Sequence, residues 1–425
     1  MGTRSVGSGG DAASTDKWSP ERIQGPVLLG MTVLMAVMLA RAPGTTDVTD
    51  YWLVWMERMR DAGLADGYAL ARSDYPPLSF VILHAADWLG GRTGLSPFSS
   101  LKAAILLFQF VAVAMLWRAS GSALLAAGFN AAITLNGAAL GYLDVFWAPP
   151  LIGALWAFRG GRRLLGFALF GVSCLVKWQP VIFAPFLLLH AFEVHRLDRA
   201  TLAGAARGPL FRRLLAVAAV TAALLLLCFG LEPARAFNAA TSHPWFSASA
   251  LNLPWIEQYA ARAAFADDFS LFQEQALAFP RRRWVRLQKL LFLAAYAVVI
   301  WRFLRSRKGF AETVLFAVAG LLTHVMVNAG VHENHLFGAV VLGFVLVAHA
   351  PTVGNRAIAW LLTAMLNVTL LTFYEPTGPE AEWRLVGIDL SVPLAALCVL
   401  GWVAVLRPAW AVPRAGGRCR SPRSG

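Results

Sequence analysis

The sequence predicts an all-α, polytopic membrane protein with about 12 transmembrane helices. Three observations predict this class: apolar residues occupy 58% of the 425 positions, charged residues occupy only 14%, and apolar runs of helical length recur along the chain. A typical soluble domain carries about 25% charged residues, so this chain has too little charge to cover a water-facing surface. The mean hydropathy of +0.58 agrees with this conclusion.

The apolar runs define the predicted helices, because a span needs about 20 mostly apolar residues. The candidate spans are 25–42, 101–117, 120–136, 142–158, 163–177, 178–193, 212–231, 287–305, 309–329, 335–350, 355–373 and 387–406. The run 78–91 is shorter and follows two prolines, so we expect an interfacial or re-entrant helix there. We expect 1–24 to be a disordered cytoplasmic N-terminus, 25–406 to be one transmembrane domain and 407–425 to be a basic cytoplasmic tail.

Basic loops between the runs predict which side each loop occupies. Arginines cluster at 159–163, 196–213, 302–308 and 407–425. The positive-inside rule assigns such loops to the cytoplasm, and alternating spans place all four clusters on that side. Two long segments, 43–100 and 232–286, then lie outside, where they would form a chamber at the outer interface. The cluster of Arg281, Arg282 and Arg283 also falls outside, as an exception to the rule or as an anion site.

Charge and cysteine patterns exclude two other classes. The net charge of +13 does not indicate nucleic-acid binding, because the arginines lie in short clusters between apolar runs. The four cysteines are scattered and form no CxxC motif or Cys/His cluster, so neither a disulfide framework nor a zinc site is predicted.

Acidic residues and aromatic residues alternate in the first long segment. Asp47 directly follows the first span, Asp50 is close behind it, and Asp74-Tyr75-Pro76-Pro77 comes later. Between them, one face of a predicted surface helix carries Tyr51, Val54, Trp55, Met59 and Leu64. A carboxylate at the position of Asp47 could accept a proton from a hydroxyl group. The alternative is that these acids are only solvated loop residues and that the two prolines only start a helix.

Four further polar elements lie at the ends of spans or in the second long segment. They are Lys177 with Gln179, His332 with Glu333, the Gly-containing break that ends at Asp144, and Asn252 with Trp255. Ionisable groups at membrane-embedded helix ends are costly unless they are paired or hydrated. Lys177 could bind a phosphate or reach back to the interface. His332 and Glu333 could be a hydrated cap, and they lack the H-E-x-x-H spacing of a metal site.

The order of these elements resembles the GT-C superfamily of membrane glycosyltransferases. The closest resemblance is to the branch with the endoplasmic-reticulum dolichyl-phosphate-glucose glucosyltransferases and their bacterial polyprenyl-phosphate-sugar relatives. The shared elements are an Asp after the first span, DYPP, an Asn-Gly break that ends in Asp, K-x-Q at a span end, N-x-x-W in a late loop and then H-E. They are scattered over most of 43–340.

The resemblance carries roles to individual residues. The general base of the family matches Asp47 best. The spacing from Asp47 to the following motif is one residue longer than in the family, so Asp50 stays an alternative, and Asp74 is a further candidate. Tyr75 and Pro76 match the second loop motif, Lys177 and Gln179 the lysine element, and His332 and Glu333 the H-E element. Asp144 matches a structural or substrate-orienting position. Asn334 and His335 depart from the commoner basic-aromatic continuation, which leaves the substrate open.

The resemblance implies an inverting transfer of a sugar from a polyprenyl-phosphate donor to a hydroxyl of a glycan, glycolipid or protein. The reaction would occur on the external or lumenal face, here outside a bacterial plasma membrane. Basic groups such as Lys177, His332, Arg281 and Arg282 would offset the charge of the leaving phosphate. No DxD motif demands a metal, so we expect no cofactor, although a divalent ion stays open. The alternatives are a lipid-linked glycan flippase or polymerase and a secondary transporter.

Overall fold

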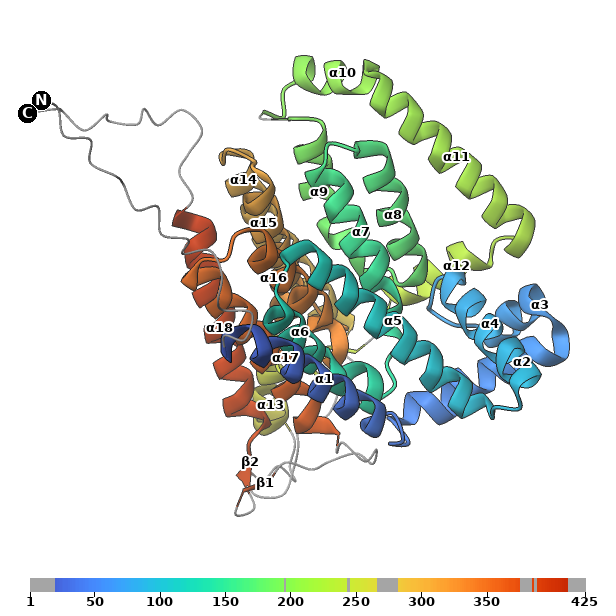
Figure 1. Ribbon diagram of the computed structural model, residues 1–425. Coiled ribbons are helices and arrows are strands. Elements are labelled where there is room, and N and C mark those ends of the chain that lie inside the picture. Colours follow the sequence, from blue (N-terminus) through green and yellow to red (C-terminus); the bar gives the residue numbers. More distant parts are fainter. Residues whose placement is uncertain are drawn as a thin grey trace, which may run out of the picture.

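The computed structural model describes residues 20–194, 196–242, 245–265, 282–374, 384–385 and 388–411. Its regular elements in these ranges are helices, with one exception: β1 (Arg384–Leu385) pairs antiparallel with β2 (Ile388–Asp389). Figure 1 shows the helices gathered into one bundle with a group of short helices at its lower right. The prediction of an all-α class is therefore confirmed for the described part of the chain.

The helices fall into three groups by length and position. The long helices are α1 (Pro20–Leu39), α5 (Pro97–Ser120), α11 (Pro209–Phe229), α14 (Arg282–Leu304), α15 (Phe310–Val327), α17 (Val353–Phe373) and α18 (Ser391–Ala411). Shorter apolar helices are α6 (Ala123–Thr134), α7 (Ala148–Arg159), α8 (Arg163–Val176), α9 (Ala184–Ala191) and α16 (Phe337–His349). The connecting segments contain α2 (Leu53–Ala62), α3 (Leu64–Ala71), α4 (Pro77–Thr93), α10 (Arg199–Arg207), α12 (Glu232–Thr241) and α13 (Leu253–Phe265).

Six helices in the described ranges are long and apolar enough to cross a membrane: α5, α11, α14, α15, α17 and α18. This supports a membrane-embedded protein. The remaining predicted spans are present in the expected order, as the shorter helices α6, α7, α8, α9 and α16 and as α1, whose apolar part is Ile23–Leu39. Apolar stretches of this length are at or below the roughly 17–25 residues that cross the hydrocarbon, so the total of about 12 spans stays a prediction.

The shorter helices are extended by turns of different geometry. α6 continues into a π-helical turn at Leu135–Ala139, and 3₁₀ turns precede α7, α9 and α16 at Leu143–Trp147, Gln179–Phe183 and Glu333–Leu336. The three 3₁₀ turns carry Asp144, Gln179 and Glu333, respectively. Each of the three predicted site residues therefore lies where a span changes its backbone geometry.

Burial separates a central layer of helices from a peripheral one. In α15, 78% of the most apolar stretch is buried inside the protein, whereas none of the corresponding stretch of α11 is buried. α11 lies at the edge of the bundle in Figure 1 and contacts α8 and α3. An apolar helix exposed on nearly all sides needs an apolar solvent, which suits contact with lipid.

The first connecting segment differs in detail from the predicted surface helix. Trp55 and Met59 are buried as expected, but Tyr51 is half exposed and Met56 is buried instead. Two features cause the difference. A π-helical turn at Val48–Trp52 rotates Tyr51 away from the face that an α-helical period predicts, and Gly63, with φ of +83°, ends α2 before Leu64.

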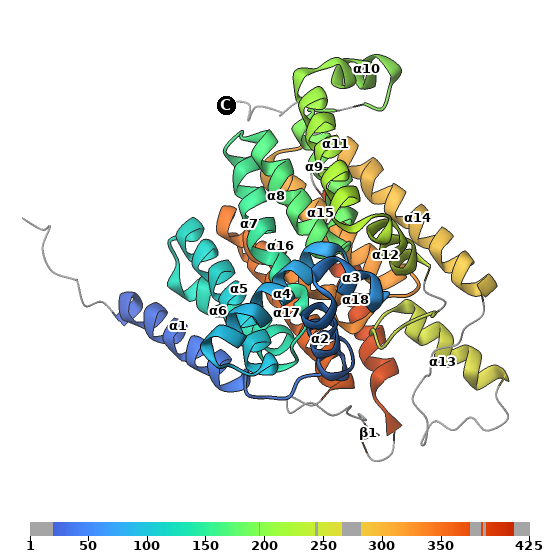
Figure 2. The same ribbon diagram turned by 90° about the vertical axis from the view of Figure 1, so that its right-hand side faces the viewer.

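The basic turns gather at one end of the bundle. The guanidinium of Arg163 pairs with the Glu193 carboxylate after α9, and the His190 Nδ1 lies 2.8 Å from the Lys308 carbonyl oxygen before α15. α10 lies at this end, whereas α2, α13 and β1 lie toward the opposite end (Figure 1 and Figure 2). The structure thus groups the loops as the charge pattern requires, and the assignment of one end to the cytoplasm stays a prediction.

Labelling of single cysteines tests the sidedness. In a variant without native cysteines, we expect Asp61→Cys and Ala264→Cys to react with a membrane-impermeant maleimide in intact cells, because both lie in the predicted external segments. Ala206→Cys on α10 should be protected until the membrane is permeabilised. Protection of both external positions would contradict the topology, and the converse pattern for all three would reverse it.

Candidate functional site

A buried ion pair forms the centre of the candidate site. The Lys177 Nζ donates a hydrogen bond to Asp144 Oδ1 over 2.7 Å, and the Asn334 Nδ2 donates to Asp144 Oδ2 over 2.9 Å. Asp144 is fully buried and Lys177 is 7% exposed. The three residues come from the start of α7, the end of α8 and the turn before α16. The sequence offered no acid near Lys177, and the fold supplies one from a different span.

A lysine that the sequence analysis missed holds the turn before Asp144. The Lys102 Nζ on α5 donates to the carbonyl oxygens of Ala138 and Ala139 over 2.9 and 2.8 Å. Lys102 is itself buried. The two carbonyl oxygens belong to the π-helical turn at the end of α6, and the lysine ammonium group supplies them with a charged hydrogen-bond donor. A single lysine inside the apolar run 101–117 was the signal that could have revealed it.

The backbone of the first segment is tied to the same turn. The Thr45 amide donates to the Leu140 carbonyl over 3.0 Å, two residues before Asp47. Gly44, with φ of +89°, allows this approach, because a Cβ there would lie 2.8 Å from the Leu140 oxygen. Only glycine adopts such a conformation at low cost, so Asp47 is placed beside the loop that carries Asp144.

Asp47 is half-buried and lies within electrostatic range of the ion pair. Burial is the main cause that raises the pKa of its carboxyl from 3.8 to about 6, while the positive charge of Lys177 lowers this pKa and the carboxylates of Asp74 and Asp144 raise it. Asp50 is exposed and accepts a hydrogen bond from the Thr49 hydroxyl over 3.0 Å. Of the two acids, Asp47 therefore lies at the buried cluster and Asp50 faces the outside.

The Asp74-Tyr75-Pro76-Pro77 motif packs directly against the lysine element. The Trp178 indole donates to the Asp74 carbonyl over 2.8 Å, and the Tyr75 ring lies 5.4 Å from the Lys177 Nζ, which is cation–π range. Pro76 is buried and caps the N-terminus of α4 in an extended conformation. A loop and a span end that are about a hundred residues apart are thus one packed unit.

The H-E element has one buried and one open member. The buried carboxylate of Glu333 accepts hydrogen bonds from the Tyr142 hydroxyl and, over 3.4 Å, from the Tyr374 hydroxyl. The His332 side chain is 40% exposed, and its Nδ1 lies 4.0 Å from Glu333 Oε2. His332 is therefore the accessible basic group at the border of the buried cluster. No pattern in the sequence pointed to Tyr374.

Buried amides without hydrogen-bond partners lie on the same turns. Both polar side-chain atoms of Gln179 and of Asn136, and the Oδ1 of Asn334, have no partner among the described residues. A buried amide atom left without a partner costs about 1–3 kcal/mol, and native proteins contain few of them. These groups are available to hydrogen-bond a polar molecule that enters the cluster.

Four predicted residues do not add described side-chain contacts to this cluster. Asn252 caps α13, since its Oδ1 accepts from the Trp255 amide over 2.9 Å, and its Nδ2 donates to the Val325 carbonyl over 3.0 Å. The Trp255 indole donates to the Ser391 hydroxyl over 2.8 Å. Both therefore fasten the second long segment to α15 and α18. Arg281 lies outside the described residues, and Arg282 begins α14 with a side chain that is not described.

Metal binding by a side-chain cluster has no candidate in the described ranges. No group of three or more His, Cys, Asp or Glu side chains there is arranged to hold an ion. The stacked imidazoles of His324 and His335 lie with ring centroids 6.2 Å apart, and the His324 Nδ1 instead contacts Asn328 Nδ2 at 3.2 Å.

The buried ion pair makes a prediction about stability. Lys177→Met should destabilise the protein by about 3–5 kcal/mol, because it leaves Asp144 buried without its counter-charge. Adding Asp144→Asn should recover most of this loss, since the amide still accepts from Asn334. Arg163→Met, which breaks an exposed pair with side chains 43% and 68% accessible, should cost under about 1 kcal/mol. Thermal unfolding of the purified variants measures the three effects, and equal melting of the single and double variants would refute the pairing.

Comparison with known proteins adds no family to this geometry. No protein-family model matches the chain, and no curated protein matches it. The resemblance to GT-C enzymes rests on the motifs, and the structure adds the way in which their residues are brought together.

Proposed function

We propose that this protein is an inverting glycosyltransferase that moves a sugar from a polyprenyl-phosphate donor to an acceptor hydroxyl. The transfer would take place at the external face of the membrane. One observation carries the proposal: Lys177 pairs with Asp144, and the charges of Lys177, Asp144 and Asp74 all act on Asp47, although the four residues come from three separate parts of the chain. The H-E element joins the same cluster through Asn334. These positions are the ones that match the GT-C motifs, and their convergence supports the proposal.

Asp47 would act as the general base. Its carboxylate takes the proton of the acceptor hydroxyl while the hydroxyl oxygen attacks the anomeric carbon. The bond between that carbon and the phosphate oxygen breaks on the opposite side, and the phosphate leaves with the electron pair. Attack from the face opposite the leaving group inverts the anomeric centre. A carboxyl with a pKa near 6 is mostly ionised at neutral pH and still basic enough to accept a proton.

The leaving phosphate needs positive charge and hydrogen-bond donors. His332 is the exposed basic group beside the cluster, so it is placed to donate to the phosphate oxygens. Lys177 is held by Asp144 and Tyr75, so it acts mainly by its electrostatic field on Asp47 and on the developing charge. The unpaired amide atoms of Gln179 could bond to sugar hydroxyl groups or to the phosphate.

The position of the site suits a lipid-linked donor. The polar cluster lies where apolar helices end, so a phosphate headgroup could reach it while its polyprenyl chain stays in the bilayer. A secondary transporter would instead place paired ionisable groups on helices broken near the bilayer midplane. Here the breaks at 143–147, 179–183 and 333–336 fall at the ends of the predicted spans and not in their middle, which supports the transferase.

Donor consumption tests the proposal. Purified protein incubated with synthetic polyprenyl-phosphate glucose, mannose or arabinose and a lipid extract should release polyprenyl phosphate from one of these donors. Asp47→Asn should reduce the initial rate about 10²–10⁴-fold, because the amide keeps the shape of the carboxylate but cannot accept a proton. The matched control is Asp50→Asn, which removes the same charge three residues away and should reduce the rate much less.

Two results would contradict the assignment. Either no polyprenyl phosphate is released from any of the donors, or Asp50→Asn is inactive while Asp47→Asn stays active. Movement of intact donor across vesicles without release would indicate a flippase.

The pH dependence of kcat/KM tests the role of Lys177. The rate should fall as pH falls through about 6, because protonated Asp47 cannot act as a base. The positive charge of Lys177 lowers the pKa of Asp47, so Lys177→Met should raise that pKa and move the acidic limb to higher pH. Lys177→Arg keeps the charge and should leave the limb close to its original position. An unmoved limb in Lys177→Met would mean that another group is the base.

A further inference from the structure

Two adjoining cavities lie at the end of the bundle opposite the candidate site. The first has a volume of about 370 Å³ and is lined by Arg118, Trp156 and Arg159 together with two small residues. The second, of about 280 Å³, shares Arg159 and is lined mainly by Arg163, His190, Glu193, Arg307 and Lys308. We propose that they form a binding site for a phosphate group, supplied by the headgroup of an anionic lipid.

The separation from the candidate site follows from α7 and α8. Asp144 precedes α7, whereas Arg159 ends it; Arg163 begins α8, whereas Lys177 follows its last residue. The 14 residues of α8 span about 21 Å. The cavities are therefore at the end where the basic turns gather, and no residue of the proposed transfer reaction lines them.

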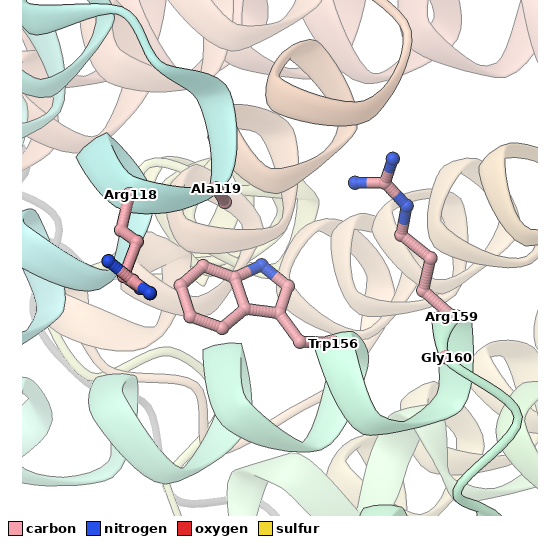
Figure 3. A pocket seen from close by; sticks show the side chains of 5 residues that line it. All are labelled: Arg118, Ala119, Trp156, Arg159 and Gly160. Carbon is pink, nitrogen blue, oxygen red and sulfur yellow. The ribbon is translucent and has the colours of Figure 1, made fainter.

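The lining carries a strong excess of positive charge. Four cations line the second cavity, and its one carboxylate, Glu193, is already paired with Arg163. Arg118 adds a fifth cation in the first cavity, where Figure 3 shows the indole of Trp156 between the Arg118 and Arg159 side chains. Guanidinium groups bind phosphate oxygens in a two-pronged geometry, so this arrangement favours a phosphate over a simple halide.

The backbone around the second cavity is held in unusual conformations. Glu193 and Lys308 have φ of +54° and +57°, and they are two of four non-glycine residues with positive φ in the described chain. Lys308 is buried; its Nζ donates to the Leu304 carbonyl over 2.9 Å, and its own carbonyl contacts His190. Such conformations are uncommon for non-glycine residues and gather at ligand-binding turns. The basic residues thus line a built cavity instead of a loose loop.

Helix ends of both polarities meet at this end, so the positive field in the cavity comes from the basic side chains. α8 begins at Arg163 and α15 begins at Phe310, so both N-termini, with their partial positive charge, are at this end. The C-termini of α7 and α9 are capped by backbone amides: Gly160 donates to Trp156, and Phe192 to Leu188, each over 2.9 Å. Backbone amides thus bond to carbonyl oxygens at these C-termini, so the arginines are not needed for that purpose and can bind a ligand.

The neighbouring surface points to a lipid as the source of the phosphate. Trp117 directly precedes Arg118 and Leu165 lies two residues after Arg163, and their exposed fractions are 43% and 46%. Tryptophan is enriched at the level of the headgroups, and basic pockets between membrane helices on the cytoplasmic side bind acidic headgroups. Both cavities are open to the surface, so a bound headgroup would leave its acyl chains outside, along the apolar surface.

Lipid binding to the full-length protein in a neutral detergent tests the proposal. Native mass spectrometry should show preferential binding of phosphatidylglycerol over phosphatidylcholine of the same chain length. Arg159→Gln with Arg307→Gln should lower the phosphatidylglycerol affinity at least about tenfold, because each cation near an anionic headgroup contributes a factor of about five. The control is Arg199→Gln with Arg207→Gln, which removes two exposed charges of α10 at the same end and should preserve the preference.

A second variant keeps the test decisive if the double variant does not fold. Glu193→Gln removes the carboxylate that competes for Arg163, so it should raise the phosphatidylglycerol affinity about threefold. Equal binding of the two lipids, or no change in either variant, would overturn the proposal. Displacement of bound phosphatidylglycerol by millimolar inorganic phosphate would confirm the phosphate site, and phosphate binding without lipid preference would identify a soluble phosphate as the ligand. No sugar donor is present, so the outcome is independent of the proposed transfer reaction.

Discussion

The arrangement of the candidate site depends on the buried pair between Lys177 and Asp144. Two unpaired charges at these positions would be strongly destabilising, so the ends of α7 and α8 must meet in one geometry. Asn334 bonds to the free oxygen of Asp144 and fixes the turn before α16 against the same point. The Tyr75 ring lies over the lysine and attaches the segment 43–100. The pair therefore organises four segments, and Asp47 takes its electrostatic environment from it.

The sequence allowed the fold class and the approximate helix positions to be predicted, because hydropathy and charge bias act locally along the chain. It also allowed most residues of the cluster to be named, since polar groups at apolar helix ends are conspicuous. It could not show which groups pair, as with Lys177 and Asp144, because pairing depends on tertiary contact. Changes in helical periodicity could not be predicted either, because the π-helical turn that rotates Tyr51 has no sequence signature. Asn252 and Trp255 looked like ligand groups, and in the structure their polar atoms cap a helix and join segments.

α7 and α8 connect two regions of opposite character. At one end, their loops contribute the buried ion pair of Asp144 and Lys177, and Asp47 from the first long segment lies half-buried beside it. At the other end their turn contributes cations that the described residues only partly neutralise. These two short helices separate the two regions. A phosphate group bound in the basic cavity would contact the turn that joins α7 to α8. Both regions would then meet phosphate groups, one during reaction and one during residence in the membrane.

The hydrogen bonds of Asp144 and Glu333 reach far along the chain, to Asn334 and Tyr374, respectively. During synthesis the first 330 residues can insert into the bilayer, yet the polar centre still lacks the groups that complete it. A nascent chain of this length already contains Asp47 and the charged groups that act on it, but it lacks Asn334 and Tyr374. The cluster closes only after the remaining C-terminal residues leave the ribosome. Truncated products would thus be membrane-bound but would lack the completed polar cluster.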